Sequence, residues 1–447
     1  MLSPASYKPN GSSDIRLLRG KLVLRFTVIL AFILTTTGCG IINSIKLRNS
    51  NDHLKPLWPT GIQTVGIETH YLGEKPYIDV TLNGVDGFKF LVDTGASVTI
   101  VMDTPKINAL GLTRGYDLAM AGWGEEEKSP AYQTQVDTLS LSGIGFTNVN
   151  LAFLPTSTTK YFLDPSEAIY DGVIGHDIMH HFSWLFDKKA NRIAISQTPH
   201  TPSDEAIEIP FDTFFSKIDI EGKIDFGNGQ TISHKIIIDT GSRHYLKVAS
   251  ALIDNEGIVL PGKPITAADF GLSGRDVHQR VTLPSLSLGE LKLTNIKTNL
   301  IGGDFEDDFS VIGSALLNQF VSVIDYHREK LYLIPYSDQP FKTKYNLLGL
   351  ELRKLVSGNF IVRFVFPDMV TAHQDFQEGD LITSINGKPS QQISLADWLN
   401  LSASPDTYTI CRLRQQELCV TLTSGQIEGY SIPVSSAKPT ISSTPSL

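Results

Sequence analysis

Short apolar runs with a period of two dominate the middle of the chain. Four of them are YIDVTL, FKFLV, KIII and LYLIP, which begin at Tyr77, Phe88, Lys235 and Leu331. Alternating or β-branched runs are typical of β-strands, and the glycine and proline residues between them mark turns. The pattern therefore predicts a mainly β fold in which helical pattern is confined to short pieces.

Three segments of the chain occur twice in the same order, which indicates an internal repeat. FKFLVDTGAS and HKIIIDTGSR align Asp93 with Asp239, 146 residues later, and the preceding strands align Ile78 with Ile224. LSLSGIGFTNVN and LSLGELKLTNIK follow, and a third pair begins with VIG, after which each copy has a short helical pattern. Repeated segments of this kind indicate one supersecondary unit used twice. The repeat predicts two mainly β lobes, at residues 71–200 and 201–340.

An Asp-Thr-Gly triplet follows an apolar strand in both copies, and an apolar-apolar-Gly follows each triplet, ending at Gly175 and Gly313. This set resembles the pepsin and retropepsin clan of aspartic proteases across residues 70–338. The resemblance implies a bilobal acid-protease-like β fold with Asp93 and Asp239 as the catalytic dyad. It also implies an aspartic endopeptidase that hydrolyses protein or peptide substrates.

Elementary electrostatics supports the same reading of the two aspartates. A pseudo-twofold between the lobes would bring the two loops together, and two adjacent carboxylates cannot both ionise cheaply. The pair then keeps one proton, so the charged carboxylate acts as general base on water while the protonated one polarises the peptide carbonyl. This chemistry calls for no metal ion, cofactor or nucleophilic side chain. A turn kept only for folding, in a pseudo-enzyme, is the alternative reading.

The neighbours of the two aspartates suit a tight turn at the lobe interface. Gly95 and Gly241 permit close backbone approach, and the resemblance implies that Thr94 and Thr240 hydrogen-bond across the axis. Ser242 is expected to donate to Asp239, which Ala96 at the matching position of the first copy cannot do for Asp93. The retropepsins often have a substrate-binding aspartate one residue later, where this chain has Ser97 and Arg243.

The resemblance implies a β-hairpin flap over the active site. Two Gly-rich turns are candidates, and their key residues are Gly122, Trp123, Gly124 and Gly271. Glycine permits hinging, and the Trp123 ring is suited to cover an apolar substrate side chain. An ordinary surface turn is the alternative. The segment HDIMHH places His176 and His180 four residues apart, but we interpret it as a short helix and predict no metal site there.

The repeat is absent after residue 340, and residues 345–425 resemble the PDZ domains of bacterial envelope proteases. EGDLITSINGKP predicts a strand whose Ile382 and Ile385 face the core, followed by a tight turn at Asn386-Gly387. Residues 395–401 are the expected groove helix. The resemblance implies that C-terminal peptides add as an extra strand, with their carboxylate on the loop of Leu348, Gly349 and Leu350. A generic β module that stabilises the lobes is the alternative.

Two of the three cysteines lie in TYTICRLRQQELCVTLT. A two-residue turn at Gln415-Gln416 would set Leu413 against Leu418 and keep an apolar face continuous, with Cys411 opposite Val420. A three-residue loop would instead set Cys411 opposite Cys419. The apolar register favours the first arrangement, and a disulfide stays open. Three cysteines in 447 residues exclude a disulfide-framework fold and a multi-cysteine zinc module.

The N-terminus carries a targeting pattern. Four basic residues precede the apolar stretch from Phe26 to Leu34, and small residues then lead into Cys39. The apolar run is too short to span a bilayer and is typical of a secretory signal. The end of the run resembles the lipobox of bacterial lipoproteins, although Thr36 stands where that family usually has Leu. An ordinary signal peptide or an uncleaved anchor is the alternative.

The lipoprotein resemblance implies a signal peptide at residues 1–38 and lipidation of Cys39. It places the protein in the bacterial cell envelope, on the periplasmic side, with a membrane anchor. Gly40 favours the outer membrane in that family. Residues 39–70 are polar with two prolines and are predicted to be a tether, and residues 426–447 to be a disordered tail.

The charge balance limits the partners. The chain has 38 Lys and Arg against 47 Asp and Glu, so its net charge is −9, and a nucleic-acid partner, which needs clustered cations, is excluded. Because both lobes lie in one chain, a monomer is expected, although lobes pairing between chains is an alternative. The competing function is a non-catalytic envelope protein that binds peptides in its cleft and PDZ domain.

Overall fold

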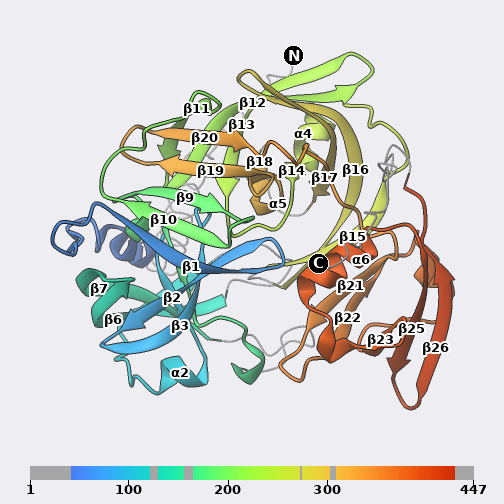
Figure 1. Ribbon diagram of the computed structural model, residues 1–447, viewed down its shortest axis with the longest axis horizontal. Coiled ribbons are helices and arrows are strands. Elements are labelled where there is room, and N and C mark those ends of the chain that lie inside the picture. The colour runs from blue at the N-terminus through green and yellow to red at the C-terminus, as the bar shows by residue number, and fades with distance from the viewer. Residues whose placement is uncertain (1–41, 121–128, 156–164, 272–273, 303–308, 428–447) are drawn as a thin grey trace, which may run out of the picture.

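The computed structural model describes residues 42–120, 129–155, 165–271, 274–302 and 309–427 (Figure 1). Its strands form one large sheet system made by two lobes, and a separate smaller sheet near the C-terminus. The predicted mainly β fold is confirmed. The fold departs from the expectations in the register of Cys411, in the extent of the tether and in the match between Ile78 and Ile224.

In the part of the first lobe that the structure describes, there are ten strands and a few short helical turns. Their bounds are β1 (Thr64–Leu72), β2 (Lys75–Leu82), β3 (Val85–Val92), β4 (Ile100–Met102), α2 (Pro105–Asn108), β5 (Asp117–Met120), β6 (Ser129–Leu141), β7 (Ile144–Leu154), η1 (Pro165–Glu167), β8 (Gly172–Ile174), α3 (His176–Met179), β9 (Ser183–Asp187) and β10 (Arg192–Ser196).

The second lobe has the same order of elements. Their bounds are β11 (Ile207–Phe214), β12 (Lys217–Gly227), β13 (Gln230–Asp239), β14 (Leu246–Ala249), α4 (Ser250–Asn255), β15 (Ile265–Gly271), β16 (Gly274–Leu288), β17 (Leu291–Ile301), β18 (Ser310–Gly313), α5 (Ser314–Leu317), β19 (Phe320–Asp325) and β20 (Lys330–Pro335).

The strand pairings of the two lobes correspond one to one. In the first lobe β3 pairs in parallel with β8, β4 in parallel with β7, and β4 antiparallel with β8. In the second lobe β13 pairs with β18, β14 with β17, and β14 with β18, in the same senses. The short helices α3 and α5 follow β8 and β18, as the helical pattern after each VIG predicts. The repeat in the sequence is therefore a repeat in topology.

An antiparallel sheet shared by both lobes joins them. Its strand order is β1, β10, β9, β19, β20 and β11, and Figure 1 shows it between the lobes. At its centre β9 of the first lobe pairs with β19 of the second, with Trp184 opposite Ile324. Both side chains are fully buried. Apolar burial across this seam holds the lobes in one fixed relation.

The predicted match between Ile78 and Ile224 is wrong. Ile78 pairs with Phe90 in the first lobe, and Ile220 pairs with Ile236 at the equivalent place in the second. The β12–β13 hairpin is longer than β2–β3, so an alignment without a gap shifts its first strand. The structural equivalents are therefore Ile78 and Ile220.

The segment predicted as a polar tether is packed on the first lobe from residue 42 onward, so that prediction is wrong for its described part. Residues 42–49 form a helix whose Leu47 is 1% exposed. Asn51 Nδ2 donates to Asp177 Oδ2 at 2.7 Å, and Leu54 is buried in the main core. Burial of these side chains offsets the entropy of ordering a segment that its prolines and polar residues mark as a loop.

Two predictions concern the ends of the chain, the targeting signal and the disordered tail. Both segments lie outside the described residues. These are the signal, with Cys39, and residues 428–447. Among the residues that the structure describes, no helix is both long and apolar enough to cross a membrane.

The third domain, residues 345–427, is built on a small antiparallel sheet with one helix. Its elements are β21 (Leu350–Lys354), β22 (Phe360–Val365), η2 (Val370–His373), β23 (Leu381–Ile385), β24 (Lys388–Pro389), η3 (Ser390–Gln392), α6 (Leu395–Ser402), β25 (Thr407–Leu413) and β26 (Glu417–Thr423). Ile382 and Ile385 are buried as predicted, and the turn at Asn386 and Gly387 has positive φ at both residues. The predicted helix over 395–401 is confirmed.

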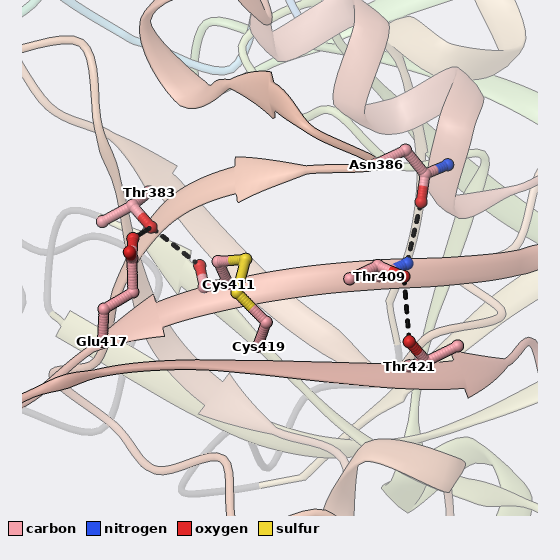
Figure 2. The surroundings of a disulfide bond; sticks show 7 residues. All are labelled: Thr383, Asn386, Thr409, Cys411, Glu417, Cys419 and Thr421. Carbon is pink, nitrogen blue, oxygen red and sulfur yellow. Dashed lines mark hydrogen bonds between the residues drawn. A yellow bond between two sulfur atoms is a disulfide. The ribbon is translucent and has the colours of Figure 1, made fainter.

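A disulfide joins Cys411 of β25 to Cys419 of β26 (Figure 2). The favoured two-residue turn is wrong, because Leu413 pairs with Glu417 and Cys411 lies opposite Cys419. Leu418 is 44% exposed at this end of the hairpin. The predicted contact between Leu413 and Leu418 would therefore lie at the surface and bury little apolar area. The register is set nearer the middle of β25, where Ile410 is fully buried.

Candidate active site

The two Asp-Thr-Gly loops lie at equivalent strand ends. Asp93 follows β3 and Asp239 ends β13, and each of these strands is held by a parallel neighbour, β8 or β18. Asp93 N donates to Ile174 O at 3.0 Å. A Cβ on Gly175 would lie 2.5 Å from the Val98 backbone, and one on Gly313 would lie 2.5 Å from the Ser242 carbonyl. Only glycine permits this packing of the VIG segments against the loops.

Thr94 and Thr240 lock the two loops together by reciprocal hydrogen bonds. Thr94 N donates to Thr240 Oγ1 and Thr240 N donates to Thr94 Oγ1, both at 3.0 Å. Each hydroxyl then donates to a backbone carbonyl of the opposite lobe, Ile238 O or Val92 O, at 2.7 Å. Both threonines are buried. The exchange predicted by the resemblance is present in the structure, with the same partners on each side.

The two carboxyl groups lie against each other's loops. A Cβ on Gly95 would lie 2.6 Å from Asp239 Cγ, and a Cβ on Gly241 would lie 2.3 Å from Asp93 Cγ. Gly95 N donates to Asp93 Oδ1 at 2.7 Å, whereas Asp239 Oδ1 is buried and has no hydrogen-bond partner among the described residues. The predicted residues are therefore brought together, and the glycines provide the space that this approach needs.

Burial and the neighbouring carboxylate dominate the electrostatics of the pair. Burial, followed by the charge of Asp239, raises the pKa of Asp93 to about 7, while Lys217 and Lys75 act in the opposite direction. Asp239 is 7% exposed. A raised pKa of this origin means that the pair retains one proton up to about neutral pH. This is the protonation state that water activation by two carboxyl groups requires.

Lys75 and Lys217 are residues of the site that the sequence did not point to. They are the first residues of β2 and β12, and the pairing of these strands with β3 and β13 makes them equivalent. Burial lowers the pKa of Lys75 to about 8, although Asp93 raises it. A gapped alignment of the two repeats would have paired these lysines in the sequence.

The residues that follow the triplets differ from the expectation. The Ser242 hydroxyl is buried and, among the described residues, has no hydrogen-bond partner, so the predicted bond to Asp239 is wrong. Ser97 Oγ donates to Phe215 O across the lobe boundary at 3.4 Å. Arg243 turns away to Glu351 of the third domain, at 2.5 Å.

Hairpins are present at both predicted flap positions. In the first lobe Met120 of β5 pairs with Ser129 of β6, and Gly122, Trp123 and Gly124 lie outside the described residues. In the second lobe Gly271 pairs with Gly274 at the end of the β15–β16 hairpin. A flap role for either hairpin stays a prediction.

The loop predicted to bind a peptide carboxylate is closed in this structure. Leu348 N and Gly349 N donate to Asn346 Oδ1, at 3.1 and 2.9 Å. Asn346 Nδ2 in turn donates to Leu350 O at 2.7 Å. Leu348 and Leu350 are fully buried. Binding of a terminal carboxylate by these amides stays a prediction, and it requires the Asn346 side chain that now accepts from them to be displaced.

The histidines of HDIMHH form ring contacts. The rings of His176 and His180 stack at 5.2 Å, and those of His180 and His181 lie 4.0 Å apart. Burial lowers the pKa of His176 and of His181 to about 4. No group of three or more possible metal ligands occurs within the described part of the chain.

Comparison with known proteins gives one family match, which lies in the first lobe, and similar solved structures. The sequence model of the aspartyl protease family matches residues 78–178, which contain Asp93 and Gly175. Among solved structures, the aspartic proteinase from Irpex lacteus has 15% sequence identity and a TM-score of 0.39, over 61% of this chain and 98% of that one. No curated protein matches the chain.

Proposed function

We propose that the two lobes form an aspartic-type endopeptidase, with Asp93 and Asp239 as the catalytic dyad. The observation that carries this proposal is the reciprocal Thr94–Thr240 exchange, which holds each carboxyl group against the glycine of the opposite loop at the lobe interface. The family match over residues 78–178 supports it from the sequence of the first lobe. The substrates are proteins or peptides.

The chemistry follows from one proton shared by the pair. The ionised carboxylate takes a proton from a bound water, and the water oxygen attacks the peptide carbonyl carbon. The protonated carboxyl donates to the carbonyl oxygen as negative charge develops there. The proton taken from the water then passes to the leaving amine as the C–N bond breaks and the carbonyl re-forms, so the pair keeps one proton, as at the start. The buried threonine exchange keeps the two groups in register without occupying their oxygens.

Replacement of either aspartate by asparagine tests the proposal. We expect Asp93→Asn and Asp239→Asn each to lower cleavage of an unfolded test protein by at least about 100-fold, because each removes an ionisable member of the pair. A peptide library with and without a pepstatin-type inhibitor provides a second measurement on the wild-type protein. Lys89→Gln, on β3 but away from the triplet, is the matched control.

Undiminished cleavage by both variants would end the dyad hypothesis. Binding of peptides by the wild-type protein, with no cleavage at any pH between 4 and 8, would favour the non-catalytic binding protein instead.

We also propose that the protein is exported and lipid-anchored through Cys39 in the bacterial envelope, with the outer membrane favoured. The support is the basic, apolar and small-residue order of the N-terminal sequence. Mass spectrometry of the mature N-terminus, in the wild type and in Cys39→Ser, tests this. Since the chain holds both lobes, we propose that it acts as a monomer.

A further inference from the structure

The third domain encloses a turn of the first lobe. Gly73, in the turn between β1 and β2, has a Cβ position only 3.3 Å from Leu395 Cδ2 and 3.5 Å from Leu399 Cδ1 of α6. Figure 1 shows the end of the β1–β2 hairpin beside α6 and β21. Helix α6 is fixed at its start by a capping box between Ser394 and Asp397. An apolar face of the helix is therefore covered by the chain's own first lobe.

Little space remains beside this turn. A cavity of about 80 Å³ lies between the lobes and the third domain, and its walls include Glu74, Leu352, Leu395 and Trp398. Pockets that bind small ligands have volumes of roughly 300–1,000 Å³. β21 is the edge strand of the third-domain sheet, where a peptide strand would be added. In this arrangement the space beside that strand and α6 is taken by the turn.

A partly buried ion-pair network joins the same domain to the second Asp-Thr-Gly loop. Arg243, which follows Ser242, donates to Glu351 Oε1 of β21 at 2.5 Å, and Arg363 of β22 donates to the same oxygen at 2.8 Å. Arg243 also lies 3.7 Å from Asp269 of β15. Glu351 is thus shared by two arginines, so its loss would remove a partner from both Arg243 and Arg363.

The β15–β16 hairpin of the second lobe is held by the third domain as well. Arg275 pairs with Glu378 at 2.9 Å, and Thr266 N donates to Asp368 Oδ2 at 2.9 Å. The Arg363 guanidinium lies 3.9 Å from the centre of the Phe270 ring. An apolar cluster shared by the hairpin and the third domain completes the contact; it contains Ile265, Ala267, Tyr345, Leu347, Phe366, Met369 and Ile427.

The first lobe has a second contact with the domain. Arg353 of β21 donates to Glu167 O at 2.9 Å, and Val356 N donates to Glu167 Oε2 at 2.8 Å. The third domain therefore touches both lobes, and its contacts include Arg243, the second residue after the second Asp-Thr-Gly triplet.

We propose that the third domain is an intramolecular clamp whose binding face is occupied by the β1–β2 turn of the first lobe. Its partner is the protease itself, and Arg243 is a positioning residue through which the clamp holds the second Asp-Thr-Gly loop. The clamp accounts for the closed Asn346 loop, since no peptide terminus has to be received there. Its effect on cleavage rests on the proposed function, whereas its contacts do not.

Two glycines offer a matched pair of variants for the test. Gly73 and Gly84 both lie in two-residue hairpin turns at positive φ, +67° and +77°, but a Cβ on Gly84 meets nothing within 4 Å. Gly73→Trp therefore adds a steric clash with α6 to the backbone strain that Gly84→Trp has alone. We expect Gly73→Trp to lower kcat/KM about tenfold more than Gly84→Trp, mainly through kcat, because the catalytic loop loses its support.

Hydrogen exchange provides a measurement that needs no activity. We expect faster exchange of α6 and of the β15–β16 hairpin in Gly73→Trp, and unchanged exchange there in Gly84→Trp. Equal exchange in the two variants would contradict the clamp whether or not the protein cleaves anything. A wild-type protein without activity would contradict the proposed function and leave this measurement intact.

A cross-link distinguishes a clamp from a gate that must open. In a Cys39→Ser background, Gly73→Cys with Leu399→Cys should be joined by a short bis-maleimide, and Gly84→Cys with Leu399→Cys should not. We expect the joined protein to keep the rate of the same variant before cross-linking. Loss of activity on joining, or a rate above wild type in Gly73→Trp, would overturn the clamp in favour of a gate.

Discussion

The two Asp-Thr-Gly loops are alike where they touch each other and different where they touch other parts of the molecule. Thr94 and Thr240 make the same four hydrogen bonds, with the same lengths. Three residues after each threonine the symmetry ends: Ser97 donates to a carbonyl of the second lobe, whereas Arg243 pairs with Glu351 of the third domain. Loops that contact each other must offer the same groups to one another. The third domain is present once, so only one of the two loops can contact it in this way.

The hairpins beside the two loops show the same contrast. In the first lobe Asn43 of the N-terminal helix donates to Asp117 O of β5, at 2.9 Å, and Leu47 packs in an apolar cluster with Leu118. In the second lobe the third domain holds β15 and β16. Each hairpin is therefore supported by a segment outside the repeat, and the two segments are unrelated.

Removal of one threonine hydroxyl is expected to have the largest effect on stability. Thr94→Val leaves the buried Thr240 N and Ile238 O without partners, and Thr240→Val leaves the two equivalent groups of the other lobe. We expect each to lower the free energy of unfolding by about 2–4 kcal/mol, measured by urea denaturation. Because the two loops make equivalent bonds, the two losses in unfolding free energy should be equal. The double variant should lose less than the sum of the two, because both threonines belong to one network.

A clear difference in unfolding free energy between the two single variants would contradict the prediction. It would show that the two threonines do not stabilise the loop contact equally. Thr69→Val is the control, because its buried hydroxyl donates only within its own strand, to Ile67 O.

The pH dependence of stability tests the electrostatics of the pair. The pKa of Asp93 is about 7 in the folded protein against 3.8 for the free side chain, so the folded state binds more protons between these values. The contribution of Asp93 to stability therefore falls as pH rises from about 4 to 7. We expect Asp93→Asn to be more stable than wild type at pH 8 by roughly 1–4 kcal/mol, and equal to it near pH 3.5.

Cleavage should follow the same titration. The rate should decrease as pH rises through about 7, because the pair then loses its shared proton. Urea denaturation at pH 3.5, 6 and 8 and a pH profile of kcat/KM provide the measurements. A difference between Asp93→Asn and wild type that stays constant over this range would contradict the assigned shift.

The smallest effect is expected at Ser242. Its hydroxyl is buried and, within the described residues, has no hydrogen-bond partner, so Ser242→Ala removes a polar group that gains nothing from its surroundings. We expect a change in unfolding free energy of less than about 1 kcal/mol, stabilising in sign, and an unchanged pH profile. The variant would make the two loops identical at this position, since the first has Ala96. A shifted pH profile in this variant would contradict the prediction. It would indicate that the Ser242 hydroxyl does donate to Asp239, as the sequence suggests.

The repeated sequence was sufficient to predict much of the fold and the centre of the site. The two Asp-Thr-Gly triplets come together because both lobes have the same strand order. Each triplet therefore lies at the end of an equivalent strand, β3 or β13. Lys75 and Lys217 were missed because their equivalence depends on strand pairing across hairpins of unequal length. The Cys411–Cys419 register was missed because an exposed hairpin end lacks the core that makes alternation informative.

The N-terminal helix, and the way the third domain packs on the lobes, were the hardest to predict, because both depend on contacts with another part of the chain. Leu47 stands in a polar, proline-containing region, and only its burial against the first lobe reveals its role. Local periodicity does not record which distant surface an isolated apolar side chain meets.

The sequence by itself determined the duplicated β lobes, the paired aspartates and the existence of a further β domain, since each of these leaves a repeated or periodic trace in the order of residues. Only the tertiary structure decided that Asn346 closes its own loop, that Arg243 turns to Glu351 and that the turn at Gly73 lies against α6. Those outcomes depend on which surfaces meet when three domains pack, and packing is selected by shape and charge summed over many residues.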